Sequence, residues 1–152
     1  MEWPEIVAGV GLSAALLALA AIDARTLRLP NAITYPLVAA GIAWNGWWTG
    51  AWMPWVVGAA LGYGVFVAVE LLYARLRGRA GLGRGDAKLL AAGGAWCGWE
   101  GLPFIVLVGS ASAIAMLLVF RERLEGEGGR VAFGPFLALG IGAVWWAGLL
   151  AG

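Results

Sequence analysis

The sequence predicts an all-α, multi-pass membrane protein, formed by a single domain over residues 1–152 with six transmembrane helices and both termini outside. Three observations favour this fold class. Hydrophobic residues make up 62% of the chain and charged residues only 12%, about half the charged share of a typical soluble domain. The lysines and arginines gather in three short segments, and long apolar runs separate these segments. The tryptophans lie at the opposite ends of those runs.

Apolar runs of roughly 18 residues or more are typical of membrane-spanning helices. On this basis we expect six spans, of which the fourth is unusually short. They cover residues 6–22, 32–48, 54–73, 87–99, 102–120 and 131–150. The first run is too long for a signal peptide and lacks the small-residue cleavage pattern, so we expect it to be retained as a helix.

The positions of the basic residues predict the orientation. All 10 lysines and arginines lie in the segments that follow the first, third and fifth spans or, for Lys88, in the first turn of the fourth span. The positive-inside rule therefore places these three segments in the cytoplasm. All 10 tryptophans lie at the other ends of the spans, as expected for an aromatic belt at one membrane interface. Both patterns predict the same topology.

The composition also excludes several kinds of site. The chain has no histidine, which excludes a catalytic histidine or a histidine-ligated metal. The single cysteine, Cys97, rules out an intrachain disulfide and a cysteine-based zinc site. No basic tract interleaves with aromatic residues, so no nucleic-acid partner is expected. We expect neither a cofactor nor a metal.

The first span ends at an acid that its position does not favour. Asp23 lies at the C-terminal end of the predicted helix, where the helix dipole is negative and a carboxylate is disfavoured. Stability alone would favour lysine or arginine there. Two interpretations stay open: a functional carboxyl group, or a solvated interfacial acid loosely paired with Arg25.

The second and third spans carry signals of helix initiation and packing. Pro30 and Asn31 precede the second span and are expected to start its helix. The third span contains Gly58-x-x-x-Gly62, a spacing that lets two helices approach closely. The same spacing recurs in the fourth span at Gly94 and Gly98. Both pairs are interpreted as packing sites.

The fourth span has only 13 residues, about 20 Å of helix at 1.5 Å per residue, whereas a hydrocarbon core is about 30 Å thick. Asp86, directly before it, would then lie below the membrane surface, in a recess lined by water or protein. Its carboxyl group is expected to cap the helix, and Gly83 and Gly85 to shape the preceding turn. The glycines around these two positions argue against a helix that extends back through them.

Asp23 and Asp86 lie on the same predicted side of the membrane and form the clearest hydrolytic pair in the chain. Two carboxyl groups that share a site cannot both ionise cheaply, so one holds a proton while the other is charged. The charged group would take a proton from water, and the protonated group would polarise an amide carbonyl. The helix-end argument suggests Asp86 as the base and Asp23 as the acid, although a coupled pair titrates as a unit.

Three segments resemble motifs of the type IV prepilin peptidases, which are intramembrane aspartic proteases. The segment GRGDAKLLAAGGAWCG, residues 83–98, matches their G-x-G-D-x-K-L pattern and the GAW-x-G that commonly follows it. DARTLRLPN, residues 23–31, is similar to their first motif, an aspartate followed by Pro-Asn. FGPFLALG, residues 133–140, resembles the start of their last helix.

The resemblance implies that Asp23 and Asp86 are the catalytic pair. It implies substrate-binding or site-shaping roles for Gly83, Gly85, Lys88, Pro30, Asn31, Gly134 and Pro135. From the residues alone, Lys88 could equally be an interfacial cation, and Gly134 and Pro135 could simply shape the start of a helix.

The resemblance further implies a substrate class and a location. The family cleaves prepilin-like proteins of type IV pili and secretion systems, which carry a short basic leader, a glycine and one apolar helix. Cleavage takes place at the cytoplasmic face of the inner membrane, so the expected partners are such single-helix proteins and the lipid bilayer.

The chain departs from larger members of the family, which carry an N-terminal extension with cysteine pairs associated with zinc and N-methylation. It resembles the short, core-only members, and methyltransferase activity is not expected. Presenilin-like proteases share the GxGD element, but their Tyr-Asp and Pro-Ala-Leu segments are absent from this sequence.

Two other classes of function stay open. A small transporter or ion channel could use the same acids, because intramembrane acids often mark ion paths. That class favours acids in the middle of helices, whereas only Glu70, about a turn inside the third span, approaches such a position. A non-catalytic scaffold descended from a protease is the other alternative.

Overall fold

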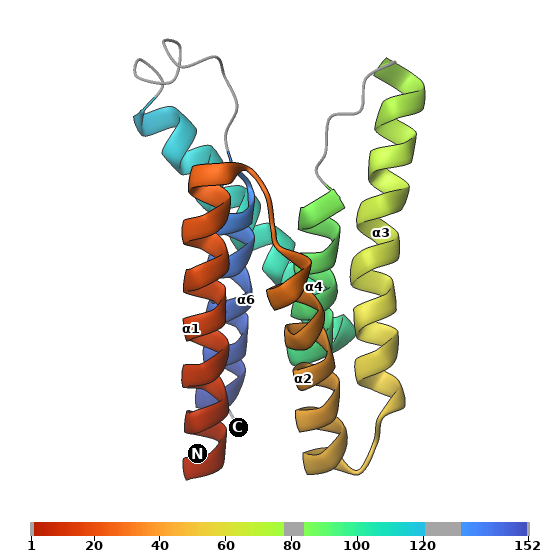
Figure 1. Cartoon of the computed structure of the whole chain (residues 1–152), viewed down its shortest axis with the longest axis vertical. Helices are drawn as coiled ribbons and strands as arrows, with labels where there is room; N and C mark the ends of the chain where they lie inside the picture. The colour runs from red at the N-terminus through yellow and green to blue at the C-terminus, as the bar shows by residue number, and fades with distance from the viewer. Residues whose placement is uncertain (1, 78–83, 121–131, 152) are drawn as a thin grey trace.

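The structure is a computed structural model that describes residues 2–77, 84–120 and 132–151 (Figure 1). Within these ranges it contains helices and short connections but no strand, which confirms the all-α prediction for this part of the chain. The helices are α1 (Trp3–Thr26), α2 (Asn31–Thr49), α3 (Met53–Arg77), α4 (Arg84–Val119) and α6 (Gly134–Ala151).

Four of these helices, α1, α3, α4 and α6, are long and apolar enough to cross a membrane. The predicted second span corresponds to α2, which is 19 residues long but is not among the four. Polar residues such as Thr34 and Asn45 lie within α2 and lower its hydropathy. The count of six spans and the orientation of the termini stay predictions.

Helix α4 is kinked at Gly98, where φ is 73° and ψ is 172°. The kink divides α4 into two segments that correspond to the predicted fourth and fifth spans, although the break comes slightly earlier than predicted. A positive φ of this size is cheap only for glycine, so Gly98 breaks the helix, and a Cβ atom added there would lie 3.4 Å from the ring of Trp55 on α3.

The carbonyl groups freed at the kink are bonded from another helix. The last carbonyls before a helix break lack intrahelical partners. The side-chain amide of Asn45, on α2, donates to the carbonyls of Ala95 and Trp96 at 3.0 and 3.2 Å. Asn45 therefore fastens α2 to the end of the first segment of α4.

The start of α4 also differs from the prediction. The helix begins at Arg84 and includes Gly85, so Asp86 is its third residue rather than its N-cap. The helical penalty of glycine applies to helix interiors, and the first N–H groups of a helix have no intrahelical partner. Glycine is therefore tolerated in this first turn.

Helices α3 and α4 approach each other through glycines, as the Gly58-x-x-x-Gly62 spacing predicted. A Cβ atom on Gly58 would overlap the carbonyl of Gly94, and a Cβ atom on Gly94 would overlap the carbonyl of Gly58. A Cβ atom on Gly62 would overlap the carbonyl of Leu90. This α3–α4 seam is therefore packed from main-chain atoms.

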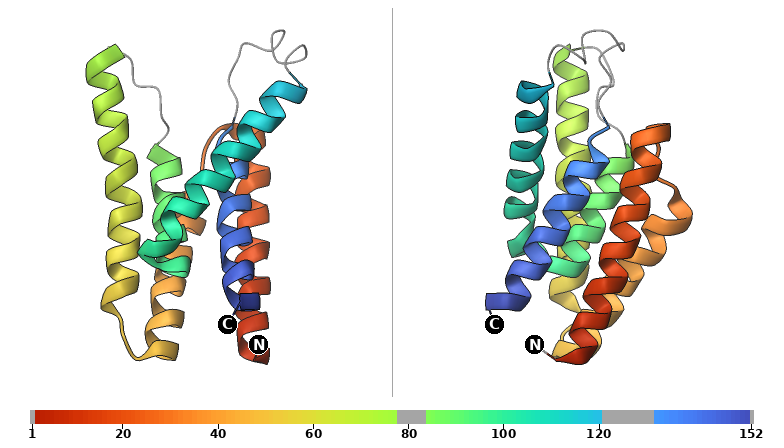
Figure 2. Two further views of the ribbon diagram at one scale, coloured as in Figure 1. Left: turned by 180° about the vertical axis from the view of Figure 1, so that it is seen from behind. Right: turned by 90° about the vertical axis from the view of Figure 1, so that its left-hand side faces the viewer.

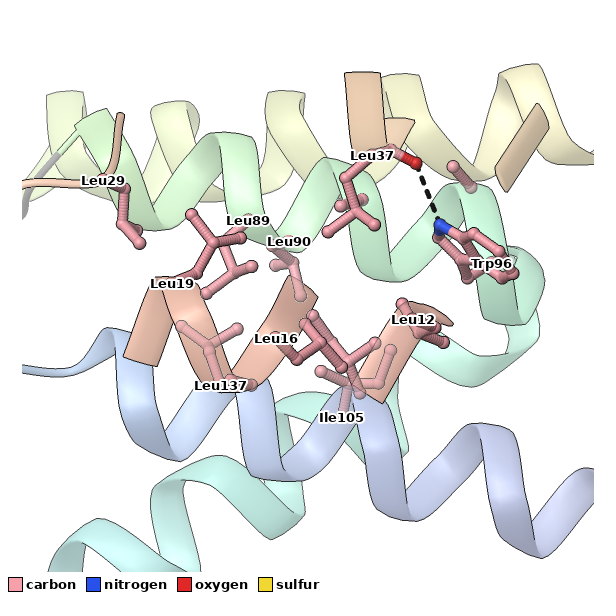
Figure 3. Close-up of a cluster of buried hydrophobic side chains, with 14 of the residues drawn as sticks. Leu12, Leu16, Leu19, Leu29, Leu37, Leu89, Leu90, Trp96, Ile105 and Leu137 are labelled. Atoms are coloured by element: carbon pink, nitrogen blue, oxygen red, sulfur yellow. Dashed lines mark hydrogen bonds between the residues drawn. The ribbon is translucent and has the colours of Figure 1, made fainter. Parts of the chain in front are cut away.

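A leucine-rich core joins α1, α2, α4 and α6 (Figure 3). Leu19 of α1 lies between Leu89 of α4 and Leu137 of α6, and Leu16 lies beside Leu90 and Ile105 of α4. Trp96, which we expected in the interfacial belt, is buried in this core and donates its Nε1–H to the Leu37 carbonyl at 2.9 Å. Its indole is held inside because α2 supplies this acceptor.

The two turned views show α1 and α6 running side by side (Figure 2). The first segment of α4 lies between α2 and α3, and its second segment crosses toward α6 (Figures 1 and 2). The core therefore connects α1, which carries Asp23, to α4, which carries Asp86.

Candidate active site

Asp23 is a buried acid in the last turn of α1, with only 5% of its surface exposed. Its Oδ2 atom accepts a hydrogen bond from the backbone N–H of Gly134, the first residue of α6, at 3.0 Å. Arg25, by contrast, is exposed. A solvated acid loosely paired with Arg25 therefore does not describe this side chain.

The chain turns sharply directly after Asp23. Leu27 has φ 52° and ψ 33°, and its N–H donates to the Asp23 carbonyl at 2.8 Å, which closes α1. A left-handed conformation costs roughly 1–2 kcal/mol for a residue other than glycine. This left-handed residue ends α1 and turns the chain toward α2.

Asp86 lies in the first turn of α4 and is half-buried. It is close enough to Asp23 for the charges of the two carboxyl groups to interact. The fold therefore brings together the two acids that the sequence places in separate motifs.

The connection from α1 to α2 passes over the start of α4. Leu29, in this connection, is buried, and a Cβ atom on Gly85 would lie 3.2 Å from the Leu29 Cβ atom. Gly85, predicted as a point of close backbone approach, thus leaves room for Leu29. Gly83, the other glycine of the predicted turn, lies outside the described residues.

Lys88 and Asn31 join α4 to α2. The Lys88 ammonium donates to the Asn31 Oδ1 atom at 2.6 Å and lies 5.4 Å from the centroid of the Tyr35 ring. Pro30 lies directly before α2, where its carbonyl accepts the N–H groups of Ile33 and Thr34. The structure therefore gathers Lys88, Asn31 and Pro30 on the α2 side of the acids.

Gly134 and Pro135 open α6 on the opposite side, against Asp23. The sequence pointed to both residues as shaping a helix start, but it did not reveal that the Gly134 main chain contacts Asp23. Leu29 and Tyr35 were also missed. Leu29 is adjacent to the Pro-Asn motif, which is the one signal that could have drawn attention to it.

The contact with Gly134 changes the argument from helix ends. Asp23 lies at the negative end of α1 and also at the positive end of α6, and Asp86 lies at the positive end of α4. Both acids therefore have a helix N-terminus nearby. Helix dipoles alone therefore do not favour a proton on Asp23 over a proton on Asp86.

Nothing in the described ranges suggests a metal centre, since no group of three or more His, Cys, Asp or Glu side chains there could hold an ion. The titratable groups at this site are the carboxyl groups of Asp23 and Asp86, whose charges interact.

Comparison with known proteins identifies relatives along most of the chain. Three of them are proteins named "Prepilin leader peptidase/N-methyltransferase". The one from Burkholderia pseudomallei (strain K96243) is 44% identical over 145 residues, which cover 93% of this chain and 47% of the relative. The one from Escherichia coli (strain K12) is 41% identical over 126 residues, covering 82% and 56%. The one from Neisseria gonorrhoeae is 37% identical over 134 residues, covering 86% and 45%.

The chain spans about half the length of the curated relatives it matches. No solved structure matches it. The type IV leader peptidase family matches residues 10–119, a stretch that includes Asp23, Asp86, Lys88 and Asn31. On the strength of this match, the chain belongs to the type IV leader peptidase family.

Proposed function

We propose that this protein is an intramembrane aspartic endopeptidase that removes the short basic leader of prepilin-like proteins at the cytoplasmic face of the inner membrane. The observation that carries the proposal is the placement of Asp23 and Asp86, two acids from distant motifs, close enough for their charges to interact. Membership of the family and relatives named as prepilin leader peptidases support the substrate class.

In the proposed reaction the two carboxyl groups share one proton. The charged carboxylate takes a proton from water, and the resulting hydroxide attacks the carbonyl carbon of the scissile amide. The protonated carboxyl group donates to the carbonyl oxygen, and a proton then passes to the leaving amine as the C–N bond breaks. The products are a leader with a new carboxyl terminus and a mature protein with a new amino terminus.

The remaining predicted residues act by shaping the site. Gly85 lets Leu29 pack over the start of α4, while Lys88 and Asn31 join α4 to α2. Pro30 precedes α2, and Gly134 and Pro135 open α6 beside Asp23. We assign Gly83 the same kind of role from its place in the GRGD motif alone.

We further propose six membrane crossings, with both termini outside and the acids near the cytoplasmic surface. Each of the two segments of α4, together with α1, α2, α3 and α6, would make one crossing. The short first segment supports a recessed position for Asp86, since it starts well below the end of α3 in Figure 1. The basic segments of the sequence support the orientation.

The relatives' name also includes an N-methyltransferase. We extend only the peptidase part of that name to this chain, because paired carboxyl groups supply hydrolytic chemistry. A small transporter or ion channel that uses the same acids is not favoured, since the family match points to a peptidase.

The proposal is tested with a prepilin-type peptide in detergent or lipid, cleaved by the wild type, Asp23→Asn, Asp86→Asn and a control variant. Glu70→Gln is the matched control, because Glu70 is a half-buried acid on α3 outside the site. We expect the wild type and the control to cleave after the leader glycine. Each aspartate variant should lose at least about 100-fold in kcat, because proton transfer by a positioned group contributes about that much or more.

Equal cleavage by all four proteins would exclude the carboxyl pair as the catalytic machinery. Ion flux that depends on the same aspartates, in the absence of any cleavage, would instead support a transporter. Each variant needs an unchanged thermal unfolding profile, so that a loss of activity is not a loss of folding.

A further inference from the structure

The start of α6 contacts Asp23 through a single main-chain group. Gly134 is the first residue of α6, so its N–H has no partner within the helix. Pro135 has no N–H, and Phe136 and Leu137 both donate to the Phe133 carbonyl. Among these first four residues of α6, the N–H of Gly134 is therefore the one left for Asp23.

The missing side chain at position 134 matters as much as the N–H. A Cβ atom built on Gly134 would overlap the Asp23 Oδ2 atom and lie 2.9 Å from the Asp23 Cγ atom. Asp23 has little room to retreat, because it is buried in the last turn of α1. That helix is fixed by Leu19, which packs against Leu137 of α6 (Figure 3). Any larger residue at position 134 would therefore displace the carboxyl group.

The position of α6 is in turn set by α4. A Cβ atom on Gly140 of α6 would lie 2.5 Å from the Ile105 carbonyl oxygen, and one on Gly109 of α4 would lie 3.2 Å from the Phe136 carbonyl oxygen. The two helices thus meet at main-chain distance. Helix α4 also carries Asp86. Its contact with α6 therefore fixes the Gly134 N–H, and with it the Asp23 carboxyl group, relative to the helix that carries Asp86.

We propose that Gly134 is a positioning residue of the peptidase, whose N–H orients the Asp23 carboxyl group and whose missing side chain leaves space for it. The inference rests on the proposed function. A backbone N–H suits a carboxyl pair that exchanges a proton, because it is neutral and cannot be titrated. A lysine or arginine in its place would hold Asp23 permanently charged.

The contact is tested without any measurement of activity by a double-mutant cycle of thermal unfolding. The cycle uses Gly134→Ala, Asp23→Ala and the double variant. Gly134→Ala should lower Tm in the wild type because the new methyl group displaces the Asp23 carboxyl group. This loss should largely disappear in the Asp23→Ala background, where the carboxyl group is gone. Additive losses would overturn the contact.

Gly148→Ala is the matched control for the cycle. Gly148 lies on the same helix with open space where a Cβ atom would be added, so its substitution should leave Tm unchanged or slightly raised, by the same amount in both backgrounds. A Tm loss at Gly148 as large as that at Gly134 would show a general effect of alanine in α6 and overturn the inference.

The catalytic part is tested by replacing Gly134 with glycolic acid, which converts the amide to an ester and removes the N–H without adding volume. We expect kcat to fall about 10-fold with KM unchanged, the effect of losing one hydrogen bond that orients a reacting group. Unchanged kcat would overturn the positioning role. If the wild type cleaves no prepilin-type peptide, the proposed function and this role fall together, whereas the unfolding cycle still decides the contact.

Discussion

The contact between Lys88 and Asn31 links the two motifs that carry the acids. Lys88 lies two positions after Asp86, and Asn31 follows the connection that leaves Asp23. The ammonium group donates to the Asn31 amide oxygen and also lies over the Tyr35 ring. Hydrogen bonds from charged groups are stronger than neutral ones, but this contact is exposed. Its net contribution is therefore about 1 kcal/mol.

We expect Lys88→Met and Asn31→Ala to be non-additive in the free energy of unfolding. Each single variant breaks the same hydrogen bond, so the double variant should cost about 1 kcal/mol less than the sum of the two. The measurement is denaturant unfolding in micelles. Arg84→Met serves as the control, because Arg84 is an exposed cation in the same turn of α4. A coupling of zero would show that the two side chains act independently.

At this scale the sequence predicted the two acids of the candidate site but not their contacts. Asp23 and Asp86 follow from their motifs and from the absence of other hydrolytic residues. The partners of Lys88 and of Asp23 could not be predicted, because Asn31 and Gly134 reach them only after four helices have packed. The donor at Gly134 is a backbone N–H, which every residue except proline carries, so the residue type does not reveal it.

At the scale of the helices, α3 and α4 approach each other through main-chain atoms, as the Gly58-x-x-x-Gly62 spacing predicted. The two surfaces of this α3–α4 seam consist of carbonyl groups and Cα atoms, with no side chain between them at Gly58, Gly62 and Gly94. Close approach of this kind lets van der Waals contact stabilise helix pairs in a membrane, where lipid is as apolar as the helices.

Gly94→Ala should destabilise the protein by about 2 kcal/mol, because overpacking a tight contact forces the backbones apart. The added Cβ atom would overlap the Gly58 carbonyl. Gly64→Ala is the control, since Gly64 lies on α3 with nothing within 4 Å of an added Cβ atom. Its unfolding temperature should equal or exceed that of the wild type. Equal stability of both variants would mean that the helices are further apart than described here.

The details of α4 show why helix boundaries were harder to predict than helices. The kink at Gly98 depends on Asn45, which reaches the freed carbonyls from another helix. At the start of α4, the absence of a side chain at Gly85 leaves room for Leu29, which comes from the connection between α1 and α2. Both features depend on residues far away in the sequence, whereas hydrophobic runs and turn residues predict only the local structure of the segment that contains them.

At the scale of the whole molecule, the two connections of α2 lie at different levels of the bundle. In Figure 1 the α1–α2 connection runs down from the upper end of α1 to the start of α2, and the α2–α3 turn lies at the lower end of the bundle. The charge distribution predicts that the first faces the cytoplasm and the second faces outward. This orientation follows from sequence alone, since a helical bundle by itself has no preferred side of a membrane.

Cysteine labelling can test the orientation in a Cys97→Ala background, because Cys97 is the single cysteine of the chain. Arg28 and Ala51 are exposed positions in the two connections. We expect a membrane-impermeant maleimide to label Ala51→Cys in intact cells, and Arg28→Cys only after permeabilisation. The reverse pattern would invert the topology, and labelling of both in intact cells would show that α2 does not cross. The parent without added cysteine should stay unlabelled.

The glycines of the α3–α4 seam limit how mutations can change its packing. A missense mutation can replace glycine only by a residue with more atoms. Every missense mutation at Gly58, Gly62 or Gly94 therefore adds atoms that overlap the facing helix, and none can leave a cavity there. Elsewhere in the core, at Leu19 or Leu137, a mutation can shrink a side chain and leave a cavity. Because the atoms that face these glycines are main-chain atoms of the other helix, a mutation there cannot remove them, and an added side chain can be accommodated only by a shift of the helices.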